Sequence, residues 1–428
     1  MPTARPNETE NETGASPPPE NVTGDAVVPV PAETAEEAES AAVPANNPFI
    51  VYVDQGELLM QYLAEEDGQL TTGQVRQLTS TGGITGVWVN PDGRKLAYLR
   101  EEAPSNALYI LNLATNTLQR VAGGDTLPAL PGLGTSAQTR YMDQVQWSAN
   151  GERLVFNTHV LPQEPGTGPA YDLWTVRPGA APVEQIPANT GGAIFALSSQ
   201  DELLLSSATT IMRADLNGTT PQTVLSFDLV NTSSEYLYFP STQWTTAGDR
   251  AYVAIPAADS LARNADFGLW RIPVGSGPGE QIGRLAVNPI ASPLYWNTDG
   301  TRLAYVRSPA GLPGNTQLHL ADSDGQNDNV YERGRNLRFL AWGMDPTTFL
   351  YSGNGYVAVG RAGADPISSL IPAGQEVTAG RWLNRDYFLI TVRTPQGQWQ
   401  LTSGNLQGQA LPLITFDHPA AIIDHWSP

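Results

Sequence analysis

The chain has 428 residues, 40% of them hydrophobic and only 15% charged, so it can bury a sizeable core. The formal net charge is −20 and no basic stripe is visible, which argues against a nucleic-acid partner, because phosphate binding needs clustered lysine and arginine. The absence of cysteine excludes disulfides, thiolate metal sites and a cysteine nucleophile.

Residues 1–47 differ in composition from the rest of the chain. They are rich in Pro, Glu, Thr and Ala, and they include nine acidic residues, one basic residue and no aromatic residue. Such a segment cannot bury enough apolar surface to offset the entropy of ordering it, so we expect a disordered acidic linker. Linkers of this kind often follow a signal peptide or a lipid anchor, which predicts an exported protein with a membrane tether. The alternative is an acidic tail on a soluble protein.

A repeat begins at residue 48. Its clearest copies are GVWVNPDGRKLAYLRE around Trp88, VQWSANGERLVFNT around Trp147 and LYWNTDGTRLAYVRS around Trp296. Each copy indicates a short strand that ends near tryptophan, a tight Asn/Asp/Gly turn and an apolar second strand. A third strand such as NALYILNL and a fourth such as LQRVAG follow. Four antiparallel strands make one blade of a β-propeller.

The number of blades follows from one anchor residue in each first strand. The anchors are 40 to 59 residues apart, close to the roughly 40–50 residues of a typical blade. In chain order they are Trp88, Trp147, Leu197, Trp244, Trp296, Trp342, Trp382 and Trp426. The regular place of the tryptophans predicts packing between neighbouring blades, in preference to a set of sugar-binding aromatic residues.

The two ends of the repeat region complete each other. Residues 49–79 supply three strands but no first strand with tryptophan, whereas the segment around Trp426 is a first strand with nothing after it. Together they predict one composite blade, which removes a free sheet edge. The predicted fold is therefore an all-β propeller of about eight blades over residues 48–428. Seven blades is the alternative, if the copy at Leu197 is not a blade.

The pattern W-S/N-x-D/N-G-x-x-L/I-A-Y/F, with a third strand and a D-x-D-G-like turn after it, resembles the TolB-like (WD40-like) propeller repeat over about residues 49–428. The resemblance implies the fold and says little about function. It does not extend to the N-terminal domain of TolB. It does not extend to propeller-bearing peptidases either, because the sequence has no G-x-S-x-G nucleophile elbow.

Few side chains suggest catalysis or metal binding, and we predict no catalytic residue and no cofactor. The run from Asp322 through Asp324 to Asp328 resembles the start of a calcium loop, which makes these three carboxylates an alternative calcium site. The twelfth position of that loop is Arg333 instead of glutamate. This departure favours an ordinary turn between the third and fourth strands and no metal site.

Loop length indicates which face of the propeller binds. The turns between first and second strands are tight, whereas long segments join neighbouring blades and join second strands to third strands. These two classes of long loop emerge on the same face, and long loops on a rigid scaffold often carry binding residues. The residues expected to bind there are Arg140, Tyr141, His159, Tyr236, Tyr238, Phe239, Arg263, Asp266 and Arg307. The alternative is that these loops only pack on one another.

These observations predict a non-enzymatic binding or scaffold module, displayed at the cell surface or envelope, that binds a protein partner through the long-loop face. The alternative is a propeller enzyme, a hydrolase or lyase that acts on a glycan or peptide at the central channel. Asp143, Asp386 and Asp424 fall near predicted inner strands, but the sequence identifies no acid–base pair among them.

Overall fold

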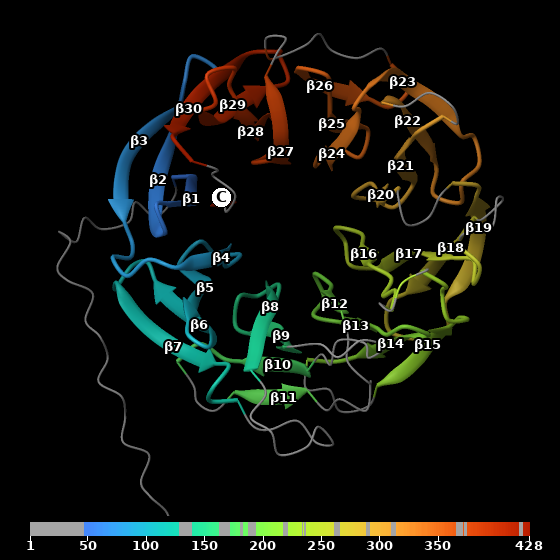
Figure 1. Ribbon diagram of the computed structural model, residues 1–428, viewed down its shortest axis with the longest axis horizontal. Coiled ribbons are helices and arrows are strands. Elements are labelled where there is room, and N and C mark those ends of the chain that lie inside the picture. Colours follow the sequence, from blue (N-terminus) through green and yellow to red (C-terminus); the bar gives the residue numbers. More distant parts are fainter. Residues whose placement is uncertain are drawn as a thin grey trace, which may run out of the picture. The chain divides into compact units, whose positions relative to one another are not determined.

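The computed structural model describes residues 47–127, 139–161, 172–179, 183–186, 194–216, 221–232, 234, 237–260, 266–287, 292–309, 314–364, 371, 375–418 and 423–428. All of them belong to one compact unit, Thr34–Pro428. They form eight antiparallel sheets arranged as the blades of a propeller (Figure 1). The described residues contain no helix that is long and apolar enough to span a membrane. The predicted all-β propeller of eight blades is thus confirmed.

The blades are numbered from the composite blade, and the strands are numbered in chain order. Blade 1 contains β1 (Phe49–Asp54), β2 (Glu57–Glu66), β3 (Gln69–Gln77) and β31 (Ile423–Trp426). Blade 2 contains β4 (Ile84–Val89), β5 (Lys95–Glu102), β6 (Ser105–Asn112) and β7 (Thr117–Gly123). Blade 3 contains β8 (Thr139–Trp147), β9 (Leu154–Leu161), β10 (Asp172–Val176) and β11 (Glu184–Ile186). Blade 4 contains β12 (Ile194–Leu197), β13 (Leu203–Ser206), β14 (Thr210–Ala214) and β15 (Gln222–Ser226).

The second half of the chain repeats this arrangement. Blade 5 contains β16 (Thr242–Trp244), β17 (Arg250–Pro256), β18 (Phe267–Pro273) and β19 (Glu280–Leu285). Blade 6 contains β20 (Leu294–Trp296), β21 (Arg302–Arg307), β22 (Asn315–Asp322) and β23 (Asn329–Arg335). Blade 7 contains, within the described residues, β24 (Arg338–Trp342), β25 (Thr348–Gly353) and β26 (Tyr356–Arg361). Blade 8 contains β27 (Glu376–Trp382), β28 (Tyr387–Arg393), β29 (Trp399–Asn405) and β30 (Ala410–Phe416).

The hydrophobic core lies between neighbouring blades. Leu99 of blade 2, for example, is in the same buried cluster as Trp147 and Phe156 of blade 3. Because a blade is covered on both faces, its middle strands are almost continuously apolar; all four residues of β13 are buried. The copy anchored at Leu197 is therefore a true blade, although it has lost its tryptophan.

The anchor tryptophans join blades, as the repeat predicted. Several donate the indole N–H to a backbone carbonyl of the preceding blade, in addition to their apolar packing. These bonds run from Trp147 Nε1 to Trp88 O at 3.0 Å, from Trp244 to Ala196 O at 3.2 Å, and from Trp342 to Tyr295 O at 2.8 Å. The aromatic repeat is thus accounted for by architecture.

The composite blade closes the ring. The last strand, β31, pairs antiparallel with β1, in a register that places Trp426 opposite Phe49 and Ile423 opposite Tyr52. The rings of Trp426 and Phe49 stack with centroids 5.7 Å apart. Closure by the two chain ends, expected from the incomplete first and last repeats, is confirmed.

The propeller has two faces. The tight-turn face carries the turns between first and second strands and between third and fourth strands. The long-loop face carries the connections between blades and between second and third strands. The strand bounds show that residues 90–94 and 383–386 lie on the tight-turn face. Residues 227–232, 237–240 and 257–260 lie in long-loop connections.

Candidate functional site

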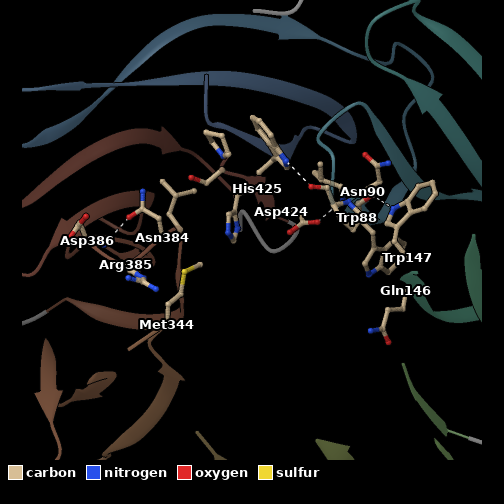
Figure 2. A pocket seen from close by; sticks show the side chains of 16 residues that line it. Trp88, Asn90, Gln146, Trp147, Met344, Asn384, Arg385, Asp386, Asp424 and His425 are labelled. Carbon is tan, nitrogen blue, oxygen red and sulfur yellow. Dashed lines mark hydrogen bonds between the residues drawn. The ribbon is translucent and has the colours of Figure 1, made fainter. Parts of the chain in front are cut away.

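A pocket of about 740 Å³ opens at the tight-turn end of the inner strands. Its lining comes from five blades, namely blades 1, 2, 3, 7 and 8 (Figure 2). The groups that decide its chemistry are Asp424 and His425 on β31, the turn residues Asn90, Asn384 and Arg385, and Met344. Such a concave site with a few convergent polar groups is the usual form of a ligand site.

Asp424 sits where three blades meet. Its Oδ2 accepts a hydrogen bond from the backbone N–H of Val89 on β4 at 2.7 Å, and its Oδ1 lies 3.2 Å from the guanidinium of Arg381 on β27. The carboxylate of blade 1 therefore contacts both neighbours of that blade. A carboxylate held by an N–H and a guanidinium has its charge satisfied, so Asp424 first of all stabilises closure.

His425 follows on the same strand and lines the pocket. Burial lowers the pKa of His425, and the charge of Arg381 acts in the same direction, whereas Asp424 opposes the shift. The ring is therefore neutral at neutral pH. Its Nδ1 is buried and has no hydrogen-bond partner among the described residues. The channel thus contains a neutral imidazole beside an ion pair.

The turn at residues 90–94 forms the wall of the pocket on blade 2. The Asn90 side-chain oxygen accepts hydrogen bonds from the N–H groups of Arg94 at 3.1 Å and Lys95 at 3.0 Å, which closes the turn. Gly93 has a φ of +69°, and a Cβ there would lie 2.5 Å from the ring of Trp426. The Trp426 indole also donates to Pro91 O at 3.0 Å. The closing strand is thus seated on a turn that requires glycine.

Gln146 lines the pocket, but its side chain is hydrogen-bonded to the backbone of the neighbouring blade. Its side-chain amide donates to Leu197 O at 3.0 Å and its oxygen accepts from Leu197 N at 3.3 Å, which ties blade 3 to blade 4. Arg385, Asp386 and Met344 are exposed at the rim. Within the described parts of the chain, no three His, Asp or Glu side chains gather to hold a metal ion. The pocket can bind a small polar group more readily than it can supply an acid–base pair.

The residues predicted to bind on the long-loop face occupy several separate places. Tyr141 and His159 lie opposite each other on β8 and β9, with ring centroids 6.0 Å apart. Tyr238 and Phe239 lie together before β16 and are half-buried, and burial raises the pKa of Tyr238 to about 12. Tyr236 and Arg263 lie outside the described residues. Asp266 lies 3.4 Å from Arg284, and Arg307 is exposed at the end of β21.

Arg140 is buried and faces a buried carboxylate. Its Nη1 lies 4.0 Å from Asp172 Oδ2, and both side chains are less than a tenth exposed. Neither of these two atoms has a hydrogen-bond partner among the described residues. Burial raises the pKa of Asp172 to about 6, although the charge of Arg140 and a hydrogen bond from Gln185 act against this shift.

This pair predicts a pH dependence of stability. Because the pKa of Asp172 is about 6 in the folded protein against an ordinary 3.8, the folded state binds more protons than the unfolded chain between these values. The contribution of Asp172 to stability should therefore fall by about 3 kcal/mol as the pH rises through this window. Urea unfolding of Asp172→Asn should lack that fall, whereas the exposed control Asp143→Asn should keep it. Identical pH profiles for the wild type and Asp172→Asn would refute the assignment.

The three carboxylates of the alternative calcium loop take different partners. Asp322 Oδ2 accepts from Asn327 Nδ2 at 2.6 Å, and Asp324 Oδ1 accepts from the N–H of Gln326 at 2.9 Å. Asp328 is hydrogen-bonded to the Tyr305 hydroxyl at 2.8 Å and lies 2.9 Å from His319 Nδ1. The segment contains the turn between β22 and β23, as the favoured interpretation expected.

The sequence did not indicate the pocket on the tight-turn face. Its turns carry no insertion, and its residues are far apart in the chain, from Asn90 to Arg385 and His425. The sequence signal that could have located this pocket is the position immediately before each anchor. In three blades that position is Gln146, Arg381 or His425. In a propeller, that position lies on the strand beside the channel.

Comparison with known proteins defines the fold and nothing finer. No family model matches the sequence, and no curated protein matches it significantly. Dipeptidyl peptidase 4 from Porphyromonas gingivalis is 10% identical, with a TM-score of 0.54 over 76% of this chain and 52% of that chain. TolB from Acinetobacter baumannii is 12% identical, with a TM-score of 0.35 over 68% of this chain and 65% of that chain.

The β-propeller domain of the Trilobed protease from Pyrococcus furiosus is 13% identical, with a TM-score of 0.47 over 79% of this chain and 99% of that chain. This chain thus spans less than two thirds of the TolB and about half of the dipeptidyl peptidase. At such low identities the likeness concerns the fold alone. A propeller fold by itself does not distinguish catalysis from binding.

Proposed function

We propose that this protein is a non-enzymatic binding or scaffold module of the cell surface or envelope, and that it binds a protein partner through its long-loop face. The observation that supports this most is the presence of two exposed leucines in the connection between blades 4 and 5. The side chains of Leu229 and Leu237 are 54% and 37% exposed, and the half-buried aromatic residues Tyr238 and Phe239 follow Leu237 in the chain. Exposed apolar and aromatic side chains on a face rimmed by charge are typical of protein interfaces.

The backbone next to Leu229 is fixed by the neighbouring loop. Asn231 N donates to Ala258 O at 2.8 Å, and the Ser260 hydroxyl donates to Asn231 O. Val230 is buried, whereas its neighbour Leu229 projects outward. A preformed surface of this kind loses little entropy when it binds a partner. The long loops thus pack on one another and still leave side chains available for binding.

Affinity capture from the native envelope, with the full chain as bait, tests this proposal. The double variant Leu229→Ser/Leu237→Ser should recover the partner about tenfold less well than the wild type, because it removes exposed apolar contact area. Tyr238→Ala and Arg263→Ala should also weaken capture. The matched control is Met344→Ser, which alters a side chain that is 51% exposed on the tight-turn face.

Leu229→Ser/Leu237→Ser and Met344→Ser, which alter exposed side chains, should keep the thermal unfolding transition of the wild type. A partner that is recovered equally by every long-loop variant, or that is lost only with Met344→Ser, would refute the proposal.

A second candidate function is that of a hydrolase or lyase that cleaves a glycan or peptide at the channel. The pocket with Asp386, Asp424 and His425 in its lining is the observation that favours it. The hydrogen bonds of Asp424 with Val89 and Arg381 argue against catalysis, because a general base needs a carboxylate that is free to take a proton. Turnover of a glycan or peptide library that disappears in His425→Gln, with unchanged folding, would support the enzyme.

The envelope location is supported by the composition of residues 1–47, which is typical of linkers in exported proteins. Fractionation of native cells should place the protein with the envelope or outside the cell. Recovery of the protein in the cytosol would contradict this part of the proposal.

A further inference from the structure

Blade 6 carries an unusual concentration of positive charge at its long-loop end. Arg307 ends β21, and Arg333 and Arg335 end β23; all three are exposed. Among the described residues, none of the three forms an ion pair, in a chain with 43 acidic and 23 basic residues. We call these three residues the arginine cluster.

The register of blade 6 places the arginine cluster on one face of the sheet. Arg307 pairs with Gln317 on β22, and Gln317 pairs with Arg333 on β23. Residues directly opposite each other in adjacent strands share a face, and so do residues two apart in one strand, which adds Arg335. Gln317 Oε1 lies 3.3 Å from His319 Nε2, so these two side chains of β22 lie on the same face of the sheet. The cluster therefore spans about 10 Å across the strands and about 7 Å along β23.

The acidic residues of this blade do not neutralise the cluster. Asp322 and Asp324 lie at the turn between β22 and β23, at the opposite end of the strands. Glu332 lies opposite Leu318 on the other face and interacts with Tyr351. Asp328 is held by Tyr305 and His319. Blade 6 is thus electrically polarised, with its uncompensated cations on the long-loop face.

We infer that the arginine cluster binds an acidic, extended segment of a protein partner. The 7 Å between side chains two apart on β23 matches the spacing of alternate carboxylates in an extended chain, and a guanidinium binds a carboxylate through two hydrogen bonds. β23 is also the outer strand of its sheet, so its edge is open to a ligand within the described residues. This inference rests on the proposed function, because it assigns a chemistry to the same partner.

A direct test uses the purified full chain and a fluorescent eight-residue peptide of alternating glutamate and threonine. Anisotropy should show saturable binding that weakens with added salt, because the contacts are exposed charges. The variant Arg333→Gln/Arg335→Gln should weaken binding about tenfold. The matched control Arg94→Gln/Arg177→Gln removes the same charge from two exposed residues in turns of the tight-turn face and should leave binding unchanged.

Two results would overturn the inference. The first is equal binding by the two double variants, which would show that position on the surface does not matter. The second is much tighter binding of a sulfated oligosaccharide than of the peptide, lost in Arg333→Gln/Arg335→Gln, which would assign the cluster to a glycan. The proposed function is tested separately: Leu229→Ser/Leu237→Ser should reduce partner capture and leave binding of this peptide intact.

Discussion

Removal of β31 is expected to open the ring and to destabilise the whole propeller. A chain that ends at residue 422 loses the pairing with β1, the stacking of Trp426 on Phe49, and both contacts of Asp424. Loss of a packed tryptophan costs about 3–5 kcal/mol, and loss of a hydrogen bond to a charged group costs about 1.5–3 kcal/mol. The expected loss is therefore about 5 kcal/mol or more, a large part of the roughly 5–15 kcal/mol of a typical domain.

Urea unfolding followed by tryptophan fluorescence measures this loss. The matched control ends at residue 426, which removes only Ser427 and Pro428 and keeps β31 whole. The chain that ends at residue 422 should unfold at a much lower urea concentration than the wild type. The control that ends at residue 426 should unfold at the same urea concentration as the wild type. Equal stability of the two truncated proteins would show that the ring does not depend on closure by β31. The open edge of β1 should also promote aggregation of the shorter protein.

Trp147→Ala is expected to lower the free energy of unfolding by about 3–5 kcal/mol. The side chain is 7% exposed, packs between blades 2 and 3, and donates to Trp88 O. Trp147→Phe keeps most of the packing and leaves that carbonyl without its donor, so its cost should be smaller, about 1–2 kcal/mol.

Chemical denaturation of the two variants distinguishes architecture from a sugar-binding role. A loss of less than about 1 kcal/mol in the free energy of unfolding for Trp147→Ala, together with loss of binding to a glycan, would favour the sugar-binding interpretation of the tryptophans.

The fold was predictable because its signals are local. Tight Asn/Asp/Gly turns between apolar strands recur at a blade-sized spacing, and such hairpins form from neighbouring residues. The composite blade was predictable by counting strands, since the segment from Phe49 needed a first strand and the segment at Trp426 needed the other three. Even the copy without tryptophan, at Leu197, keeps its turn and its apolar second strand.

The sites were less predictable because they depend on register and on distant blades. Arg140 looked like a surface residue of a long-loop face, but the structure places it beside Asp172, with both side chains buried. The arginine cluster depends on the pairing of Gln317 with Arg333, next to a bulge between Leu318 and His319. A shift of one residue would move each side chain to the other face, and composition does not reveal such a shift.

Hydrogen exchange of the protein, alone and bound to the partner captured from the envelope, tests most directly the claim that the long-loop face is the binding face. The account predicts slower amide exchange on binding at residues 226–240 and at β23, with no change at the tight turns. Protection confined to residues 90–94 and 383–386, around the pocket on the tight-turn face, would contradict it.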